Sequence, residues 1–273
     1  MMSAHGTDQV FSGSIPELYD TLLVPLIFAP YAQDMAARAA ACQPLRVLEV
    51  AAGTGAVTRA LAQALPATTE IVATDLNPPM LERAAAVGTC RPVTWQPADA
   101  QQLPFADGSF DLVICQFGVM FFPDRPKAFA EARRVLTGGG KLLFSVWDRI
   151  EDNDFANAVT KALAKRFPEN PPMFLARTPH GHYDPAPIQA DARAGGFTAE
   201  VTYDVVTACS RADTARTVAT AYCQGTPVRA ELEAIGGNAL ADATDVCTDA
   251  LAARFGAGPV EGKIQALMFS VTA

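Results

Sequence analysis

The segment Val47-Leu-Glu-Val-Ala-Ala-Gly-Thr-Gly-Ala-Val-Thr58 decides the fold that we predict for this chain. A short apolar run, residues 45–51, leads at once into two closely spaced glycines, Gly53 and Gly55. Glycine permits a sharp turn and lets a ligand approach the backbone, and residues 56–65 continue at helical spacing. The segment therefore predicts a buried strand that turns directly into a helix, whose first N–H groups suit a negatively charged group.

An acidic residue follows this turn at the spacing typical of nucleotide-binding sheets. Asp75 lies twenty residues after Gly55, at the end of the apolar run 70–75. A carboxylate at that place accepts hydrogen bonds from both hydroxyls of a ribose. The competing interpretation is a turn that only packs a helix, followed by an incidental aspartate. Because strand, turn, helix, strand and acid occur in the expected order, we favour a nucleoside-binding loop.

The same alternation continues along the chain. Further strands are expected at 93–96, 110–116, 141–147, 200–206 and 264–271, with helices at 78–87, 126–136 and 154–167. Strands alternating with helices predict an α/β fold with a parallel sheet covered on both faces. Before the first strand we expect helices at 16–23, with Ser14 as its cap, and at 32–41. Four parts are predicted: a helical lid (1–44), the nucleoside-binding core (45–148), an insertion (149–198) and a C-terminal completion of the sheet (199–273).

Composition narrows the function classes. The chain has 273 residues, of which 50% are hydrophobic and 18% charged, and its net charge of −8 makes nucleic acid and membrane surfaces poor partners. Its longest uncharged stretch, residues 21–33, is too short to span a bilayer, and we expect no signal peptide. Six widely spaced cysteines without a Cys-x-x-Cys pair indicate reduced thiols, no metal site and a cytoplasmic location. A homodimer is compatible with the sequence.

Two ligand classes use a strand–turn–helix of this kind: dinucleotides and S-adenosylmethionine. The dinucleotide pattern requires glycine or alanine where this chain has Thr58, whose branched side chain disfavours close approach of helix and strand. Glu49, at the entry to the turn, would repel a pyrophosphate and suits a ligand that carries an amino group. S-adenosylmethionine is therefore the expected cofactor, and a nicotinamide-dependent oxidoreductase is the alternative.

At this point the chain resembles a known family. Four segments resemble, in order, motifs of class I S-adenosylmethionine-dependent methyltransferases of the type 11, ubiquinone/menaquinone methyltransferase-like group: Glu49-x-x-x-Gly53-x-Gly55, residues 75–80, residues 99–111 and residues 134–140. The resemblance covers about residues 45–148. It implies a Rossmann-like, doubly wound sheet of seven strands, mostly parallel with the last strand antiparallel, and methyl transfer to a small organic acceptor. One departure is Ala51, where the family often has glycine.

The resemblance also implies roles for single residues around the donor. Glu49 and the loop residues would surround the methionine part, Asp75 the ribose, Leu76 and Met80 the adenine ring, and Asp99 the adenine amino group. The full expected cofactor set is Tyr19, Glu49, Ala51, Gly53, Thr54, Gly55, Asp75, Leu76, Met80, Asp99, Ala100, Gln116 and Phe117. For Asp99 and Gln116 a purely structural hydrogen bond is the competing interpretation.

The acceptor side is marked less clearly. His180 and His182 precede Tyr183 and Asp184 in a segment rich in proline and glycine, and a His–Asp pair there would serve as a base. A hydrogen-bonded loop is the competing interpretation, and we expect His5, the third histidine, to lie in an N-terminal tail. Since the donor methyl is already activated, a methyltransferase needs no obvious base. A non-catalytic protein that binds S-adenosylmethionine therefore stays a second alternative.

Overall fold

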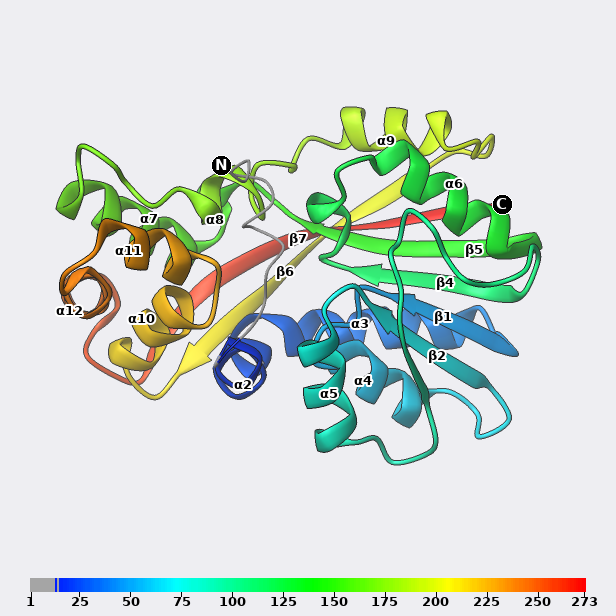
Figure 1. Cartoon of the computed structure of the whole chain (residues 1–273), viewed down its shortest axis with the longest axis horizontal. Coiled ribbons are helices and arrows are strands. Elements are labelled where there is room, and N and C mark those ends of the chain that lie inside the picture. Colours follow the sequence, from blue (N-terminus) through cyan, green and yellow to red (C-terminus); the bar gives the residue numbers. More distant parts are fainter. Residues whose placement is uncertain (1–12, 14) are drawn as a thin grey trace. The chain divides into compact units, whose positions relative to one another are not determined.

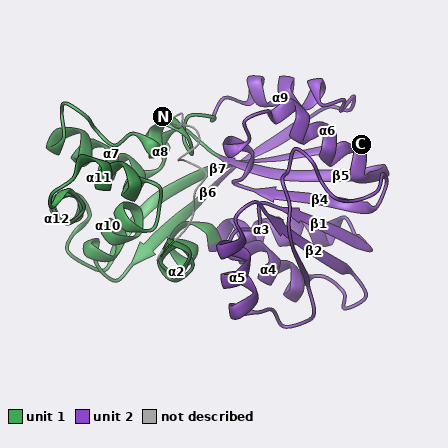
Figure 2. Ribbon diagram, in the orientation of Figure 1, with its two compact units in different colours: residues 1–28, 147–182, 207–265 green, residues 29–146, 183–206, 266–273 purple. Residues whose placement is uncertain are grey.

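The computed structural model describes residue 13 and residues 15–273. The expected cap Ser14 and the tail histidine His5 lie outside these described residues. The chain divides into two compact units, which Figure 2 distinguishes by colour. Unit 1 contains residues 1–28, 147–182 and 207–265, and unit 2 contains residues 29–146, 183–206 and 266–273. Each unit is therefore assembled from three separate stretches of sequence, and the predicted four-part division stays a prediction.

One seven-stranded sheet carries the fold, with the strand order β3-β2-β1-β4-β5-β7-β6. The neighbouring strands among β1 to β5 are parallel. For example, Val47 of β1 lies opposite Ile71 of β2, and Ile114 of β4 lies opposite Leu143 of β5. The strand bounds are Arg46–Val50 (β1), Glu70–Asp75 (β2), Thr94–Pro97 (β3), Phe110–Gln116 (β4), Leu136–Trp147 (β5), Thr202–Ala212 (β6) and Val260–Thr272 (β7). This confirms the predicted α/β sheet, in which strand order reverses between β1 and β4.

The strand β7 is antiparallel to the strands beside it. The Ala273 N–H donates to the Gly140 carbonyl, and the Asp148 N–H donates to the Gln265 carbonyl, so β7 is antiparallel to β5. Both β6 and β7 are longer than the sequence predicts. Their extra length carries cross-strand polar pairs, such as Arg211 Nε with Glu261 at 2.6 Å, which the apolar pattern alone does not reveal.

Helices cover both faces of the strands in unit 2. In Figure 1, α3, α4 and α5 lie together on one side of β1, β2 and β4, and α6 and α9 lie on the other. Their bounds are Ala29–Ala41 (α3), Ala56–Ala64 (α4), Pro78–Val87 (α5), Arg125–Val135 (α6) and Pro185–Ala194 (α9), with a short 3₁₀ turn η2 at Val119–Phe121. The core between these layers contains an aromatic cluster. The ring of Phe144 stacks on that of Phe269, with 4.7 Å between the ring centroids, and its centroid lies 5.3 Å from that of Phe129 in α6. The strands β1, β2 and β4 are therefore buried on both faces, as parallel sheets require.

Unit 1 is mainly helical. Its helices are α2 (Ile15–Leu18), η1 (Tyr19–Phe28), η3 (Ile150–Asp152), α7 (Asp154–Arg166), α8 (Phe174–Arg177), α10 (Ala215–Gln224), α11 (Val228–Ile235) and α12 (Ala239–Phe255). The long helix α12 packs on α10 and α7 through fully buried residues such as Cys247 and Leu251. Across the described ranges, no helix combines the length and the apolar character that crossing a membrane requires.

The N-terminal helices differ from the prediction of two separate helices at 16–23 and 32–41. The described chain is helical without a break from Ile15 to Ala41, and its middle part, η1, is a π-helix that contains Pro25. Proline has no backbone N–H and clashes with the preceding turn of an α-helix. The wider π turn accommodates Pro25, so the helix continues through it.

Candidate cofactor site

The loop between β1 and α4 has a left-handed backbone at three of its five residues. The φ angles are 56° at Ala51, 56° at Gly53 and 83° at Gly55. Gly55 occupies the N-cap of α4, and no side chain caps that helix end. A Cβ atom at Gly55 would lie 2.9 Å from Cη2 of Trp95. The glycine is therefore required twice, for its φ angle and for the close approach of Trp95, which sequence reasoning did not single out.

Asp75 closes this loop from the end of β2. Its Oδ2 accepts a hydrogen bond from the Gly53 N–H at 2.8 Å, and its Oδ1 accepts one from the Asn77 N–H at 2.8 Å. The side chain is buried, and this burial raises the pKa of its carboxyl above the ordinary value. Oδ1 also accepts from the Asn77 side-chain amide at 3.4 Å, so Oδ2 is the oxygen that retains capacity for a further donor. Asp75 therefore lies where the sequence predicts it, at the carboxyl edge of the sheet beside the glycine loop.

The side chain of Thr54, between the two glycines, adds an observation that points to a ligand. Thr54 is 1% exposed, and its Oγ1 is buried without a hydrogen-bond partner among the residues described. Buried polar atoms are almost always hydrogen-bonded, so an orphaned hydroxyl in a loop of this shape needs an explanation. A polar ligand in the loop supplies one. The loop with Asp75 thus fits the donor and acceptor groups of an adenosyl amino acid.

Glu49 is a buried residue of β1, two positions before Ala51. It is 2% exposed, and its Oε2 accepts a hydrogen bond from the Thr58 hydroxyl of α4 at 2.6 Å. Burial, together with the nearby charge of Asp75, raises the pKa of Glu49 to about 8. Glu49 is therefore mostly protonated at neutral pH in the ligand-free chain. The sequence singled out Glu49 and Thr58 separately, but did not pair them.

Two strained residues mark the ends of adjacent strands. Ala51 follows β1 and Phe117 follows β4, with φ angles of 56° and 54°. Residues other than glycine seldom adopt positive φ, and such strain gathers at functional sites. The Phe117 N–H donates to the carbonyl and the hydroxyl of Ser145. The Phe117 ring packs edge-to-face on Tyr31, with 5.4 Å between the ring centroids. The strain thus lies at the switch point between β1 and β4, where open α/β sheets bind ligands.

Gly118 explains how the loop tolerates alanine at position 51. A Cβ atom on Gly118 would lie 2.7 Å from the Cβ of Ala51 and 2.6 Å from Sγ of Cys115. The absence of a side chain at Gly118 therefore makes room for the methyl group of Ala51. The sequence analysis noted the departure at Ala51, but nothing near it in sequence indicated the compensating glycine 67 residues later.

The residues expected at the adenine ring follow β2 and β3. Leu76 is 53% exposed, whereas Met80 and Ala100 are buried. Asp99, two residues after β3, accepts hydrogen bonds at Oδ1 from the N–H and the side-chain amide of Gln101, at 2.8 and 3.3 Å. Gln116 ends β4 and is partly buried. Of the thirteen expected cofactor residues, all but Tyr19 thus belong to unit 2.

Tyr19 and the two histidines belong to unit 1. The ring of Tyr19 stacks on that of Phe28, with 4.8 Å between the ring centroids. The centroid distance is 5.9 Å from Phe28 to Trp147 and 5.8 Å from Trp147 to His180. This series is termed the aromatic row. Phe28, Trp147 and His180 are each less than 10% exposed. A buried aromatic cluster with one imidazole is therefore part of unit 1.

His180 is fixed in one tautomer. Its Nδ1 lies 2.8 Å from the backbone carbonyl of Asp148, and a carbonyl only accepts, so Nδ1 carries the proton. Burial lowers the pKa of His180 to about 4. His182 Nδ1 lies 3.2 Å from the Thr178 carbonyl, and Asp184 caps α9 by accepting from the Ala186 N–H. These contacts are of the kind that the competing interpretation, a hydrogen-bonded loop, anticipates.

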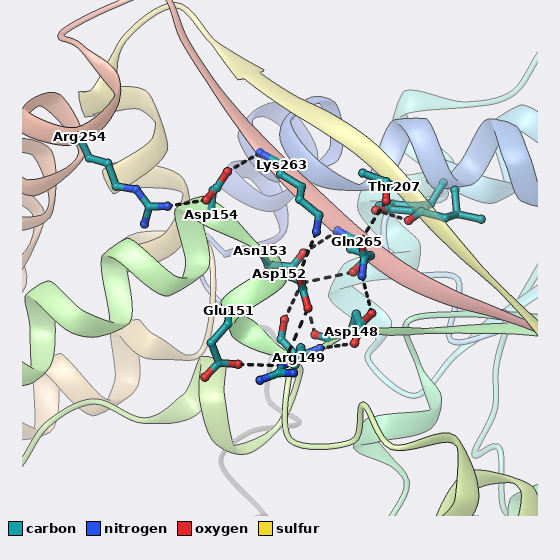
Figure 3. A network of polar contacts seen from close by, with 12 residues as sticks. Asp148, Arg149, Glu151, Asp152, Asn153, Asp154, Thr207, Arg254, Lys263 and Gln265 are labelled. Atoms are coloured by element: carbon teal, nitrogen blue, oxygen red, sulfur yellow. Dashed lines mark hydrogen bonds and ion pairs between the residues drawn. The ribbon is translucent and has the colours of Figure 1, made fainter.

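A polar network holds the carbonyl partner of His180. Figure 3 shows Asp148 joined to Gln265, whose side chain also accepts from Thr207. Asn153, 1% exposed, donates to the Asp148 carbonyl at 3.3 Å and accepts from the Gln265 N–H at 3.0 Å. The network therefore fixes the end of β5 against β7 and the start of α7. No group of three or more metal-ligating side chains occurs in the described part of the chain.

Comparison with known proteins agrees with this geometry. The family model for a methyltransferase domain matches residues 48–144. An uncharacterised protein of Mycobacterium bovis is 38% identical over 131 residues, which cover 46% of this chain and 46% of the relative. A demethylmenaquinone methyltransferase of Deinococcus radiodurans is 42% identical over 110 residues, 40% of this chain and 45% of the relative. The chain thus aligns with less than half the length of these curated relatives.

A solved structure extends the likeness of fold to the whole chain. A phosphoethanolamine N-methyltransferase of Haemonchus contortus, in complex with S-adenosylhomocysteine, superposes with a TM-score of 0.60 at 16% identity. That match covers 100% of this chain and 61% of the other. At this identity the likeness shows the fold alone.

Proposed function

Since residues 48–144 belong to the methyltransferase domain family, we propose that the whole chain is an enzyme that transfers a methyl group from S-adenosylmethionine to a small organic acceptor by direct in-line transfer. The observation that carries the proposal is the left-handed loop at residues 51–55 with Asp75 bonded to it. The buried, unpartnered hydroxyl of Thr54 supports a polar ligand there. The alternative of a nicotinamide cofactor is disfavoured by the buried Glu49–Thr58 pair, which occupies the place where a dinucleotide site needs a small residue.

In this proposal the chain holds the donor along the carboxyl edge of β1, β2, β3 and β4. The loop and Glu49 bind its amino acid part, Asp75 accepts from the ribose hydroxyls, and Asp99 accepts from the adenine amine. Contacts of the backbone or apolar side chain are proposed for Ala51, Gly53, Gly55, Leu76, Met80, Ala100 and Phe117, and polar contacts for Thr54, Gln116 and Tyr19. The burial of most of these residues supports a site that excludes water.

When bound, S-adenosylmethionine supplies a sulfonium-activated methyl group. The contribution of the chain is then to orient the acceptor behind that methyl and to exclude water. Holding two reactants in line is worth up to about 7–11 kcal/mol of the barrier. The strained backbone at Ala51 and Phe117 supports a site whose geometry is set before the ligand arrives.

For the acceptor we propose a small apolar or aromatic molecule. The aromatic row of unit 1 supports an apolar partner, as does the demethylmenaquinone methyltransferase among the relatives. The neutral, tautomer-locked ring of His180 suits acceptance of a hydrogen bond at Nε2 better than removal of a proton, because its pKa is about 4. His182 is proposed as its companion in this role.

Two further proposals concern the protein as a whole. All six cysteines are free thiols, which supports a reducing compartment such as the cytoplasm. We also propose a homodimer, and light scattering on the purified chain measures the oligomeric state directly.

The proposed function is tested in two steps. Isothermal titration with S-adenosylhomocysteine and, separately, with NAD should give binding of the first and none of the second. A methyl-release assay with labelled donor and a panel of phenols, quinols and amines should then identify an acceptor class. Binding of NAD alone would reverse the assignment. Binding of S-adenosylhomocysteine with no transfer to any member of a broad panel would instead favour a non-catalytic binding protein.

A further inference from the structure

The ring of His180 is held firmly within unit 1. The His180 N–H donates to the Leu175 carbonyl at 3.0 Å, and the ring Nδ1 lies 2.8 Å from the Asp148 carbonyl. The next residue has no room for a side chain, because a Cβ atom on Gly181 would lie 2.1 Å from the carbonyl oxygen of Arg177. The backbone and one ring nitrogen are therefore fixed independently. A ring that is fixed in advance loses little freedom when a ligand binds to it.

The other ring nitrogen of His180 has no protein partner. Among the residues that the structure describes, no hydrogen bond or ion pair reaches Nε2. Since Nδ1 carries the proton, Nε2 has a bare lone pair and only accepts. The residue is 6% exposed, and burial lowers its pKa to about 4, so the ring is neutral at pH 7. Buried polar atoms almost always have a partner, so this lone pair points to a ligand that supplies a donor.

The ring lies among aromatic side chains. Its centroid is 5.8 Å from that of Trp147, whose centroid is 5.9 Å from that of Phe28. All three residues are buried. In such surroundings an unmet hydrogen bond costs more than it does at the surface, because water does not replace it. A ligand that fits Nε2 therefore combines an apolar body with one neutral donor group.

We propose that His180 makes the chain select acceptor molecules that carry a neutral hydrogen-bond donor such as a phenolic hydroxyl, an inference that rests on the proposed function. The hydroxyl of a phenol donates to Nε2, whereas the corresponding methyl ether has no hydrogen to donate. An ether would leave the buried lone pair unpaired, and this penalty opposes its binding. His180 is then a specificity-determining residue, and its role requires no transfer of a proton.

The test compares two ligands that differ in this one group. Phenol and its methyl ether, anisole, are titrated into the full chain in the presence of saturating S-adenosylhomocysteine, and binding is followed by nitrogen NMR. The wild type should bind phenol about five- to tenfold more tightly than anisole, the factor that one ordinary hydrogen bond represents. Phenol should also shift the Nε2 signal of His180, and anisole should not.

Two variants complete the comparison. In His180→Asn the side-chain amide can still donate to the Asp148 carbonyl, as Nδ1 does, but the acceptor at the position of Nε2 is gone. This variant should bind phenol and anisole about equally. Tyr183→Phe is the matched control, because Tyr183 lies in the same loop between α8 and α9 and is 45% exposed. It should keep the preference of the wild type.

The possible results separate this inference from the proposed function. Equal affinity of the wild type for phenol and anisole would overturn the inference, as would an unchanged preference in His180→Asn that circular dichroism shows to be folded. Binding of neither ligand by a chain that binds S-adenosylhomocysteine would overturn it as well. These results leave the donor site intact. A wild-type chain that does not bind S-adenosylhomocysteine would instead contradict the proposed function itself.

Discussion

The buried carboxyl of Glu49 gives the ligand-free chain a pH dependence that one substitution should remove. Burial raises the pKa of Glu49 from 4.5 to about 8 in the folded chain. A group whose pKa is higher in the folded than in the unfolded state stabilises fully below its unfolded pKa, and this stabilisation is lost as the pH rises through the folded value. The free energy of unfolding should therefore fall between pH 5 and pH 8 because of this one residue.

The size of the effect follows from the two pKa values. Each unit between them is worth about 1.36 kcal/mol, so Glu49 should lower the free energy of unfolding by about 3 to 4 kcal/mol between pH 5 and pH 8. Glu49→Gln keeps the shape and retains an oxygen for the Thr58 hydroxyl, but it has no proton to lose. At pH 5 the variant and the wild type should be similar in stability, and at pH 8 the variant should be the more stable protein.

Urea unfolding at pH 5, 6, 7 and 8, without ligand, measures the difference. The matched control is Glu70→Gln, since the side chain of Glu70 is 66% exposed and pairs only with Arg46 at the surface. That control should run parallel to the wild type across the whole range. A constant difference between Glu49→Gln and the wild type at all four pH values would refute the reasoning, because it would mean that Glu49 is already ionised in the folded chain.

Four further measurements address the site. Asp75→Ala should weaken S-adenosylhomocysteine binding by about 1–3 kcal/mol in calorimetry, and unchanged affinity would contradict the ribose assignment. Ala51→Gly should raise the urea midpoint by relieving about 1 kcal/mol of left-handed strain, and a lower midpoint would show that the packing of the methyl group matters more. Gly118→Ala should cost about 1–3 kcal/mol of stability through overpacking against Ala51, with the same unfolding assay as its check. Nitrogen NMR should find the His180 ring neutral, with the proton on Nδ1, from pH 6 to pH 8; titration in that range would refute the locked tautomer.

The apolar runs, the glycines and the spacing to Asp75 were sufficient to predict the alternating α/β order and the edge of the sheet that carries the site. These are local signals, since each strand and helix reveals itself within about ten residues. The N-terminal helix was predicted wrongly as two pieces, because a π turn around Pro25 depends on what packs against it. The same holds for the ends of β6 and β7, whose polar residues are paired across strands.

By itself, the sequence determined which strand–turn–helix forms the glycine loop and which acid follows it, because these residues lie within one short stretch of the chain. Only the tertiary structure decided which groups are paired and which are left available. The bond from Thr58 that keeps Glu49 buried, the space that Gly118 leaves for Ala51, and the carbonyl that fixes His180 all join separate elements. Burial sets the pKa values of Glu49 and His180, and burial is a property of packing that no local pattern of residues specifies.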